Sequence, residues 1–253
     1  MKNIYQQAAI HLLNNRKVGN KITPLAAELS PENFDQALRV QEEMITLRSD
    51  TVAGWKCLLP LDENKLIAAP IFADTVQSGE SCTLLMDNGK ARIEPEIAFV
   101  LGKDLPARVT DYTEAEINDA VKSCHMALEL MQVRFRDHPE VTFFEKLADG
   151  MLNQGLYLGP EINKEKAYAA SEININVDQA TSKQQFDGVH PNKSTYKPLH
   201  WMINFMTKRG ISFKAGEAFI TGSFAGIVVV EFNEVTTISY EGLGEYQVTF
   251  IDG

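Results

Sequence analysis

The segment 92–101 (RIEPEIAFVL) constrains the fold of this chain more than any other stretch. Its β-branched and aromatic residues are typical of a strand. Side chains alternate across a strand, so Glu94 and Glu96 are predicted to share one face, with Ile97 and Phe99 on the other. Two carboxylates on one face repel each other unless a positive charge lies between them, and a divalent cation with oxygen ligands meets that need. By spacing alone, a half-solvated strand that shows both acids to water is the more common case.

Length and charge limit the classes of protein that the chain can belong to. Its 253 residues allow one large domain, or a small domain attached to a main one. The formal net charge of −10 argues against a nucleic-acid partner, because phosphates would be repelled. An anionic small-molecule substrate remains compatible, since one lysine or metal ion reverses the field at a single site.

The cysteines and the apolar runs predict a cytoplasmic protein. Cys57, Cys82 and Cys124 are odd in number and widely spaced, without a C-x-x-C motif, so neither a disulfide framework nor a zinc site is expected. The first residues lack the apolar core of a signal peptide. No apolar run approaches the length needed to span a membrane, so no membrane partner is predicted.

Hydrophobic periodicity and turn residues predict an α+β protein with helices at its start and much antiparallel sheet. One helix is expected to begin at Ser30 and Pro31, and another to follow the capping box Thr113–Glu116, with Val121 and Cys124 on its apolar face. The expected helices cover 3–14, 31–48, a stretch from 114, 143–151 and 198–210. The expected strands cover 52–59, 92–101, 155–160, 173–177, 184–188 and a β-rich end over 219–250.

The segment 125–135 (HMALELMQVRF) fits either a continued helix or a new strand. In a helix, Glu129 would be solvated, or it would pair with His125 at i, i+4 around a metal. In a strand, it is one acid within a buried apolar run, and such an acid needs a partner. We rank the strand above the helical metal pair.

The residues Lys56, Asp74, Glu94, Glu96 and Glu129 stand out chemically, and the motifs around them resemble a known group. The similar stretches, in order, are DQALRVQ (35–41), GWK (54–56), FAD (72–74), RIEPEIA (92–98), ALE (127–129), ADG (148–150), LYLG (156–159) and ITGS (220–223). Together they resemble the 2-keto-4-pentenoate hydratase group of the fumarylacetoacetate hydrolase superfamily over nearly the whole chain. The segment ending at Gln41 favours the hydratase and decarboxylase branch.

This resemblance implies a fold and a cofactor. The fold is a fumarylacetoacetase C-terminal-like mixed β-roll with flanking helices, in which residues 1–50 form a helical segment packed on a catalytic domain of residues 51–253. The cofactor is Mg2+ or Mn2+ held by Glu94, Glu96 and Glu129, since hard oxygen ligands suit a hard cation. The strand interpretation of Glu129 follows from the same resemblance.

The resemblance also implies a hydro-lyase that adds water to a 2-hydroxy-2,4-dienoate through a metal-stabilised enolate. The expected ligand is a small 2-oxo or 2-hydroxydienoic acid. Lys56 is the candidate for proton transfer or for holding the enolate charge, and Asp74 for general acid–base work or water positioning. Ser223 is expected to approach the substrate. The structural alternatives are a surface lysine, an aspartate that caps a turn and a serine that only closes a hairpin.

Two departures from the group's pattern keep other functions open. Cys57–Pro60 replaces the usual glycine and small polar residue after the lysine, and Gly150–Leu152 is bulkier than usual. The absence of a lysine over residues 149–154 argues against the carbon–carbon hydrolases. The alternatives are a 2-oxo acid decarboxylase of the oxalocrotonate type and a non-catalytic partner subunit with the same fold. Homo-oligomerisation is implied by the resemblance alone.

Overall fold

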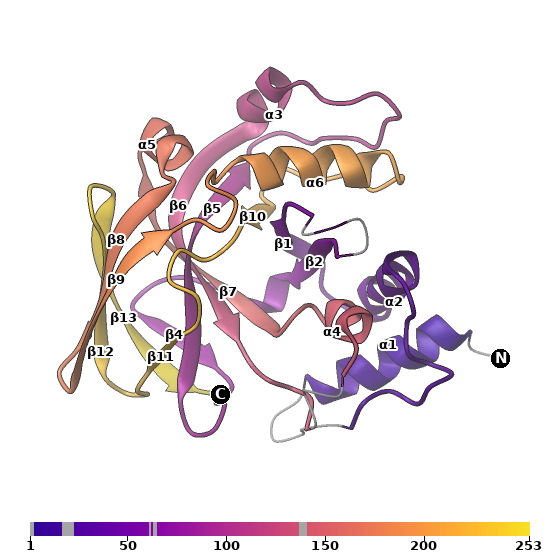
Figure 1. Ribbon diagram of the computed structural model, residues 1–253, viewed down its shortest axis with the longest axis horizontal. Coiled ribbons are helices and arrows are strands. Elements are labelled where there is room, and N and C mark those ends of the chain that lie inside the picture. The colour runs from indigo at the N-terminus through magenta and orange to yellow at the C-terminus, as the bar shows by residue number, and fades with distance from the viewer. Residues whose placement is uncertain (1–2, 17–22, 61, 63–64, 137–140) are drawn as a thin grey trace.

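Two β-sheets and a set of surrounding helices make up the computed structural model, which describes residues 3–253 except 17–22, 61, 63–64 and 137–140. The larger sheet has the order β2-β1-β10-β5-β6-β7-β3, with β11 paired to β5 as well, and the smaller has the order β4-β13-β12-β8-β9 (Figure 1). The strands are β1 Val52–Leu58, β2 Ile67–Phe72, β3 Val76–Gln77, β4 Ser81–Leu84, β5 Ala91–Leu101, β6 Val121–Met131, β7 Asn153–Ile162, β8 Glu172–Gln179, β9 Ser182–Val189, β10 Ala218–Ile220, β11 Val228–Val230, β12 Val235–Tyr240 and β13 Gly244–Asp252. This arrangement confirms the predicted α+β class.

The helices flank the sheets in two main groups. Helices α1, α2 and α4 lie together beside β2, and α6 packs against β1 near α3 (Figure 1). Their bounds are α1 Ile4–Asn15, α2 Phe34–Leu47, α3 Glu114–Ala120, α4 Phe143–Ala148, α5 Lys164–Ala169 and α6 Lys197–Thr207, with a 3-10 turn η1 at Ala73–Thr75. None of the helices in the described ranges has the length and apolarity to cross a membrane.

The two sheets meet over a buried tyrosine. Tyr240 of β12 is 1% exposed, and its hydroxyl lies 3.2 Å from the Glu96 carbonyl oxygen of β5 and 3.0 Å from the Ala127 carbonyl oxygen of β6. A buried hydroxyl needs such a partner, so Tyr240 fixes the smaller sheet against the two central strands of the larger one.

The N-terminal helices are fastened to the β part by side-chain hydrogen bonds. Gln41 of α2 is buried, and its amide donates to the carbonyl oxygens of Ala68, 3.2 Å away, and Leu147, 2.7 Å away. Helix α2 begins at Phe34 and not at Pro31, because the Asn33 side chain caps it by accepting a hydrogen bond from the Gln36 amide. The prediction of a start at Ser30 was therefore wrong, while a division of the chain at residue 50 stays a prediction.

The segment after the capping box changes from helix to strand earlier than predicted. Thr113 and Glu116 form the capping box, which confirms that part of the prediction. Helix α3 ends at Ala120, however, so Val121 and Cys124 belong to β6 and not to a helix face. Glu129 accordingly lies in a strand, which excludes the helical metal pair with His125.

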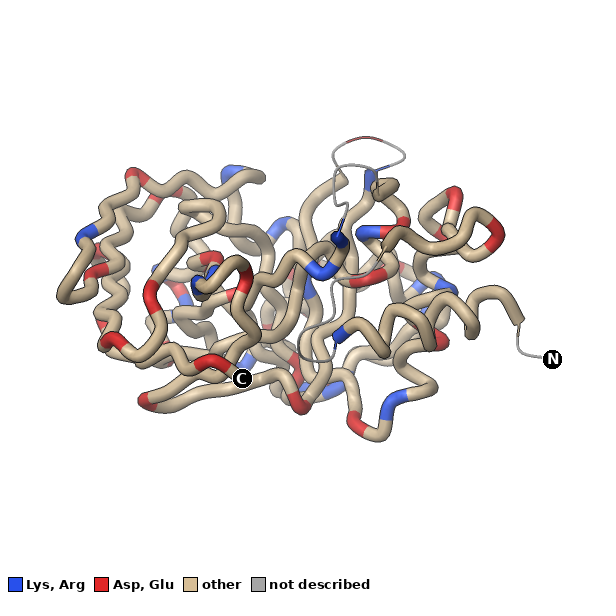
Figure 2. The backbone as a smooth tube through the Cα atoms, turned by 90° about the horizontal axis from the view of Figure 1, so that it is seen from below, with Lys and Arg blue, Asp and Glu red and all other residues tan. Residues whose placement is uncertain are grey.

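The other predicted elements are largely present. Strands β8 and β9 pair antiparallel, as expected for 173–177 and 184–188, and β10 to β13 form the β-rich end. The three cysteines are buried and free. Acidic and basic positions are interspersed along both the β part and the helical part (Figure 2).

Candidate metal centre

Three glutamates come together because of the register between β5 and β6. Glu94 and Glu96 lie two residues apart on β5 and share a face, as predicted. Glu129 of β6 is the direct cross-strand partner of Glu94 in the antiparallel pair. Like charges directly opposite each other destabilise a sheet, so this position requires a compensating charge.

The three carboxylates form a compact, largely buried cluster. Oxygen atoms from Glu94, Glu96 and Glu129 all lie within 4.8 Å of one another. Glu96 and Glu129 are 2% and 1% exposed, and Glu94 is half-buried. Burial, together with the charge of Glu129, raises the pKa of Glu94 to about 7 and that of Glu96 well above its ordinary value. Without a bound cation the cluster therefore favours protonated carboxyls, because the site does not stabilise three negative charges by itself.

Lys56 supplies one positive charge to the cluster. It lies on β1 opposite Ile220, the last residue of β10. Strand β10 lies between β1 and β5, and because it ends at Ile220 the Lys56 side chain can reach past that end to the glutamates of β5 and β6. Its Nζ donates to Glu129 Oε1 at 2.6 Å. Burial by itself would lower the pKa of Lys56, but the charges of Glu129 and Glu94 outweigh it and hold the pKa above the ordinary value. Lys56 is therefore an ammonium group that pairs with only one of the three acids.

The donor set fits a divalent cation. Oxygen ligands of such an ion lie ~2.1–2.5 Å from it, which places them up to ~4–5 Å from each other, in the range seen for this cluster. All three ligands are carboxylates, the hard donors that Mg2+, Mn2+ and Ca2+ prefer. When all three carboxylates are ionised, the Lys56 ammonium balances one of them, and a dication would balance the two negative charges that remain. The cluster can therefore hold one hard divalent ion.

The turn after β10 closes the site around Glu96. The backbone N–H of Gly222 donates to Glu96 Oε2 at 2.6 Å and orients that carboxylate. Gly222 has φ 126, and a Cβ there would lie 2.7 Å from side-chain atoms of Leu58 and Pro191, so only glycine fits without displacing the wall. The next residue, Ser223, lines the same cavity, with its hydroxyl 3.1 Å from the Pro95 carbonyl oxygen.

Two further residues of the site were not predicted from the sequence. Asn153, at the start of β7, is 2% exposed and donates from Nδ2 to Glu129 Oε1 at 2.9 Å. The carbonyl oxygen of Met151 accepts from Lys56 Nζ at 3.2 Å. Met151 and Leu152 both have positive φ values, 53 and 71, which bulky residues rarely adopt. The sequence held one indication of this contact, because residues 150–152 are bulkier than the hydratase pattern predicts.

Asp74 does not join these residues. It lies in η1, is 59% exposed on its side chain, and pairs with Arg48 through a 2.5 Å contact from Nη2 to Oδ1. It lines a different cavity, which it shares with Arg16 and Arg134. The structure thus brings Lys56, the three glutamates and Ser223 together, and separates Asp74 from them.

The cavity at the glutamates is small and mostly apolar beyond its acidic end. Its volume is about 220 Å3. Leu58, Pro191 and Ile220 form its walls, and Cys57 lies beside them, a buried thiol whose pKa is raised by burial and by Glu96. Among the described residues that line it, Lys56 is the single cation. The space suits a short carbon chain with one anionic end.

Three comparisons relate the chain to known proteins. Residues 66–251 match the model of the fumarylacetoacetate (FAA) hydrolase C-terminal family. A 2-keto-4-pentenoate hydratase of Burkholderia vietnamiensis is 25% identical over 163 residues, which span 64% of this chain and 61% of that relative's length. One from Paraburkholderia xenovorans is 24% identical over 257 residues, covering 97% of this chain and 94% of that relative.

A solved structure shares the fold. The 4-oxalocrotonate decarboxylase of Pseudomonas putida, complexed with magnesium and adipate, superimposes with a TM-score of 0.76 at 18% identity, over 98% of this chain and 97% of that one. At this identity, the likeness establishes the fold and not the reaction.

Proposed function

The chain belongs to the fumarylacetoacetate (FAA) hydrolase family, and from this membership and the geometry of the acidic cavity we propose that it is a divalent-metal-dependent hydro-lyase. The proposed reaction is addition of water to a short 2-hydroxy-2,4-dienoate, as the names of the hydratase relatives suggest. The observation that carries the proposal is the buried triad Glu94, Glu96 and Glu129 with Lys56 directly beside it.

Each residue of the site has a proposed part. Glu94, Glu96 and Glu129 would hold the cation, Mg2+ or Mn2+. The similar decarboxylase structure is a complex with magnesium, which supports a divalent ion in this fold. The bound cation would supply a Lewis acid that polarises the 2-oxo group of the substrate. Lys56 would hold a proton at Nζ, 2.6 Å from Glu129, and would transfer it to the substrate or balance the negative charge that develops there.

The remaining residues would position and enclose the substrate. Asn153 would fix Glu129 by its hydrogen bond, and Gly222 would fix Glu96. Ser223 lies on the cavity wall, and its hydroxyl hydrogen bonds with backbone oxygens of Pro95 and Gly226, so its proposed part is to shape the turn that faces the substrate. Leu58 and Pro191 would exclude water from the carbon chain.

The wall of the cavity favours the hydratase over the decarboxylase alternative. A 2-oxo-dicarboxylate of the oxalocrotonate type carries a second carboxylate, which needs a cation or several donors when it is buried. The described residues lining the cavity include no cation besides Lys56, and that ammonium already pairs with Glu129. A substrate with an apolar far end therefore fits better.

The test combines metal binding with turnover. Metal-free protein is titrated with Mn2+ and assayed for loss of dienol absorbance with 2-hydroxypenta-2,4-dienoate, and for carbon dioxide release from oxalocrotonate. Glu96→Gln keeps the acceptor for the Gly222 N–H and removes one charge, so we expect metal affinity and turnover to fall together. Glu145→Gln is the matched control, because Glu145 is equally buried and also accepts a backbone N–H, from Leu25, away from the site.

The outcomes separate the candidate functions. Dienol loss that requires metal and Glu96 supports the hydro-lyase, and carbon dioxide release instead supports the decarboxylase. Metal binding without turnover of either acid contradicts both and leaves the partner-subunit alternative. Assembly into a homo-oligomer and a cytoplasmic location stay predictions from the sequence.

A further inference from the structure

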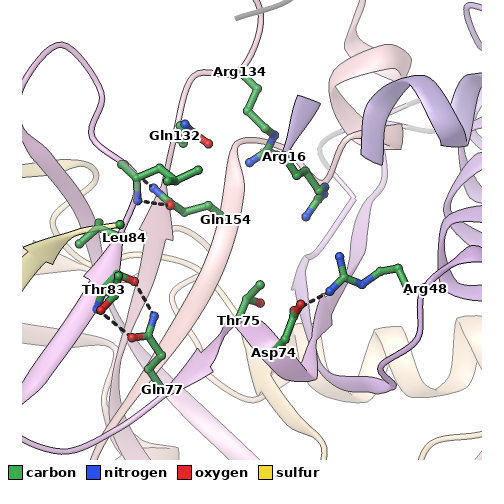
Figure 3. A pocket seen from close by; sticks show the side chains of 12 residues that line it. Arg16, Arg48, Asp74, Thr75, Gln77, Thr83, Leu84, Gln132, Arg134 and Gln154 are labelled. Carbon is green, nitrogen blue, oxygen red and sulfur yellow. Dashed lines mark hydrogen bonds and ion pairs between the residues drawn. The ribbon is translucent and has the colours of Figure 1, made fainter. Parts of the chain in front are cut away.

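A second cavity, rich in arginine, lies apart from the acidic one. Its volume is about 560 Å3, and none of its lining residues lines the acidic cavity. Arg16, at the end of α1, and Arg134, after β6, meet on one side of it, with Gln132 and Gln154 facing them and Asp74 with Arg48 on a third side (Figure 3).

Two of these guanidinium groups share one carboxylate. Arg134 is 1% exposed and donates from Nε to Asp149 Oδ2 and from Nη2 to the Asp149 carbonyl oxygen, both at 2.7 Å. Arg16 donates from Nη2 to the same carbonyl oxygen at 2.6 Å, and its Nε lies 3.8 Å from Asp149 Oδ1. Two cations against one anion leave one positive charge on this side of the cavity.

Some buried polar atoms at this place lack a hydrogen bond. Arg134 Nη1 is such a donor, and Gln132 Oε1 and Asp149 Oδ1 are such acceptors. Arg16 Nε also lacks a hydrogen bond, although it forms an ion pair with Asp149 Oδ1. Buried polar groups are normally paired, so unpaired donors and an unpaired acceptor around one cavity indicate a ligand that supplies both functions. Burial and the neighbouring Arg134 also lower the pKa of Arg16 to about 9, as expected for two cations short of a counter-charge.

We propose that this cavity binds a small hydroxycarboxylate, whose carboxylate accepts from Arg16 and Arg134 and whose hydroxyl donates to Gln132 Oε1. Guanidinium groups recognise carboxylates through such charge-assisted hydrogen bonds. The volume accommodates a short carbon chain beside Leu84 and Leu85. The site is separate from the metal centre, and the proposal does not depend on the proposed reaction.

Opposite charges on the cavity wall make the test directional. Arg48 is paired with Asp50, 2.6 Å away, and with Asp74, so two carboxylates share one guanidinium there. The negative charge left over repels an anion in the cavity, whereas the positive charge of Arg16 attracts it. Arg16→Gln is expected to weaken binding about tenfold or more, and Asp74→Asn to strengthen it several-fold. A gain of affinity in the second variant cannot result from misfolding.

The experiment is calorimetric titration of the metal-free full chain with malate, with succinate, which lacks the hydroxyl, and with inorganic phosphate. We expect malate to bind most tightly, and Gln132→Leu to reduce its affinity to that of succinate. Glu96→Gln, at the separate metal centre, is expected to leave the affinity for malate as in the wild type. Arg209→Gln, which removes an exposed arginine elsewhere, is the control for net charge. The proposal is overturned if none of the three anions binds saturably, if phosphate binds as tightly as malate, or if Arg16→Gln matches the wild type.

Discussion

Lys56 Nζ lies 2.6 Å from Glu129 Oε1, and this contact joins the end of β1 to the acidic face of β5 and β6. Both groups are largely buried, with side-chain exposures of 12% and 1%. Removal of one partner of a buried ion pair leaves the other uncompensated, so the two residues act as a unit. The ammonium is thus held against the carboxylates where a substrate bound beside them would meet it.

The first prediction concerns the charge of Lys56. Lys56→Met keeps most of the unbranched side chain and removes the ammonium, so we expect turnover of the dienol to fall about 10^2–10^4-fold, the usual contribution of a positioned proton donor. Metal affinity is expected to persist or increase, because a competing cation is removed. Steady-state kinetics and Mn2+ titration measure the two effects. Lys164→Met, which removes a half-buried lysine bonded to backbone oxygens of Asn118 and Val121, should retain activity.

The second prediction concerns the pH dependence of metal binding. The pKa of Glu94 is raised to about 7 by burial and Glu129, so below that pH the metal-free carboxyl is largely protonated. A metal must displace this proton and also the one that Glu96 holds, so we expect its affinity to rise about tenfold or more per pH unit below pH 7. Calorimetry in buffers of different ionisation enthalpy should show release of about one proton or more near pH 6. An affinity that is constant across this range would contradict the assignment of Glu94 as a ligand.

The third prediction concerns Asn153 as a positioning residue. Its Nδ2 donates to Glu129 Oε1, and loss of such an outer partner typically weakens metal binding ~10–100-fold. We expect Asn153→Ala to weaken Mn2+ binding by that factor, while turnover at saturating metal falls less. Asn204→Ala, which removes an amide bonded to the Tyr112 backbone, is the control. Equal metal affinity in both variants would show that Asn153 does not position Glu129.

The acidic face of β5 could be predicted because its determinant is local. Alternation along 92–101 is enough to place Glu94 and Glu96 together. Glu129 could not be placed from periodicity, since no glycine or proline marks the change from α3 to β6 between Ala120 and Val121. The residues themselves ranked the strand only above the helical metal pair, and the resemblance to known hydratases favoured the strand over a solvated helical position.

The remaining parts of the site depend on contacts that no local pattern records. The left-handed backbone at Met151 and Leu152 turns a carbonyl toward Lys56, although bulky residues rarely adopt it. Asp74 is drawn to Arg48, a residue 26 positions earlier that the pattern around Asp74 does not indicate. Long-range partners of this kind are set by the packing of α2 and η1, and the pairing with Arg48 holds Asp74 away from the site to which the prediction assigned it.

The fourth prediction concerns Glu217, a buried acid beside the start of β10. Trp55 Nε1 donates to its Oε2 at 2.8 Å, yet burial prevails and raises the pKa of Glu217 to about 7. Because the folded protein binds this proton more tightly than the unfolded chain, the stabilisation is present below about pH 4.5 and is lost as pH rises toward and past 7. The rise from 4.5 to about 7 corresponds to roughly 3 kcal/mol at most.

Glu217→Gln keeps the acceptor for Trp55 and removes the titration. We expect the variant to be more stable than the wild type near pH 8, with the difference shrinking toward pH 5. Urea unfolding followed by tryptophan fluorescence, with metal chelated in both proteins, measures it. The exposed Glu172→Gln should show no such pH-dependent difference. A stability gap that is independent of pH, or that widens as pH falls, would mean that Glu217 is ionised in the folded protein at all these pH values, held so by Trp55.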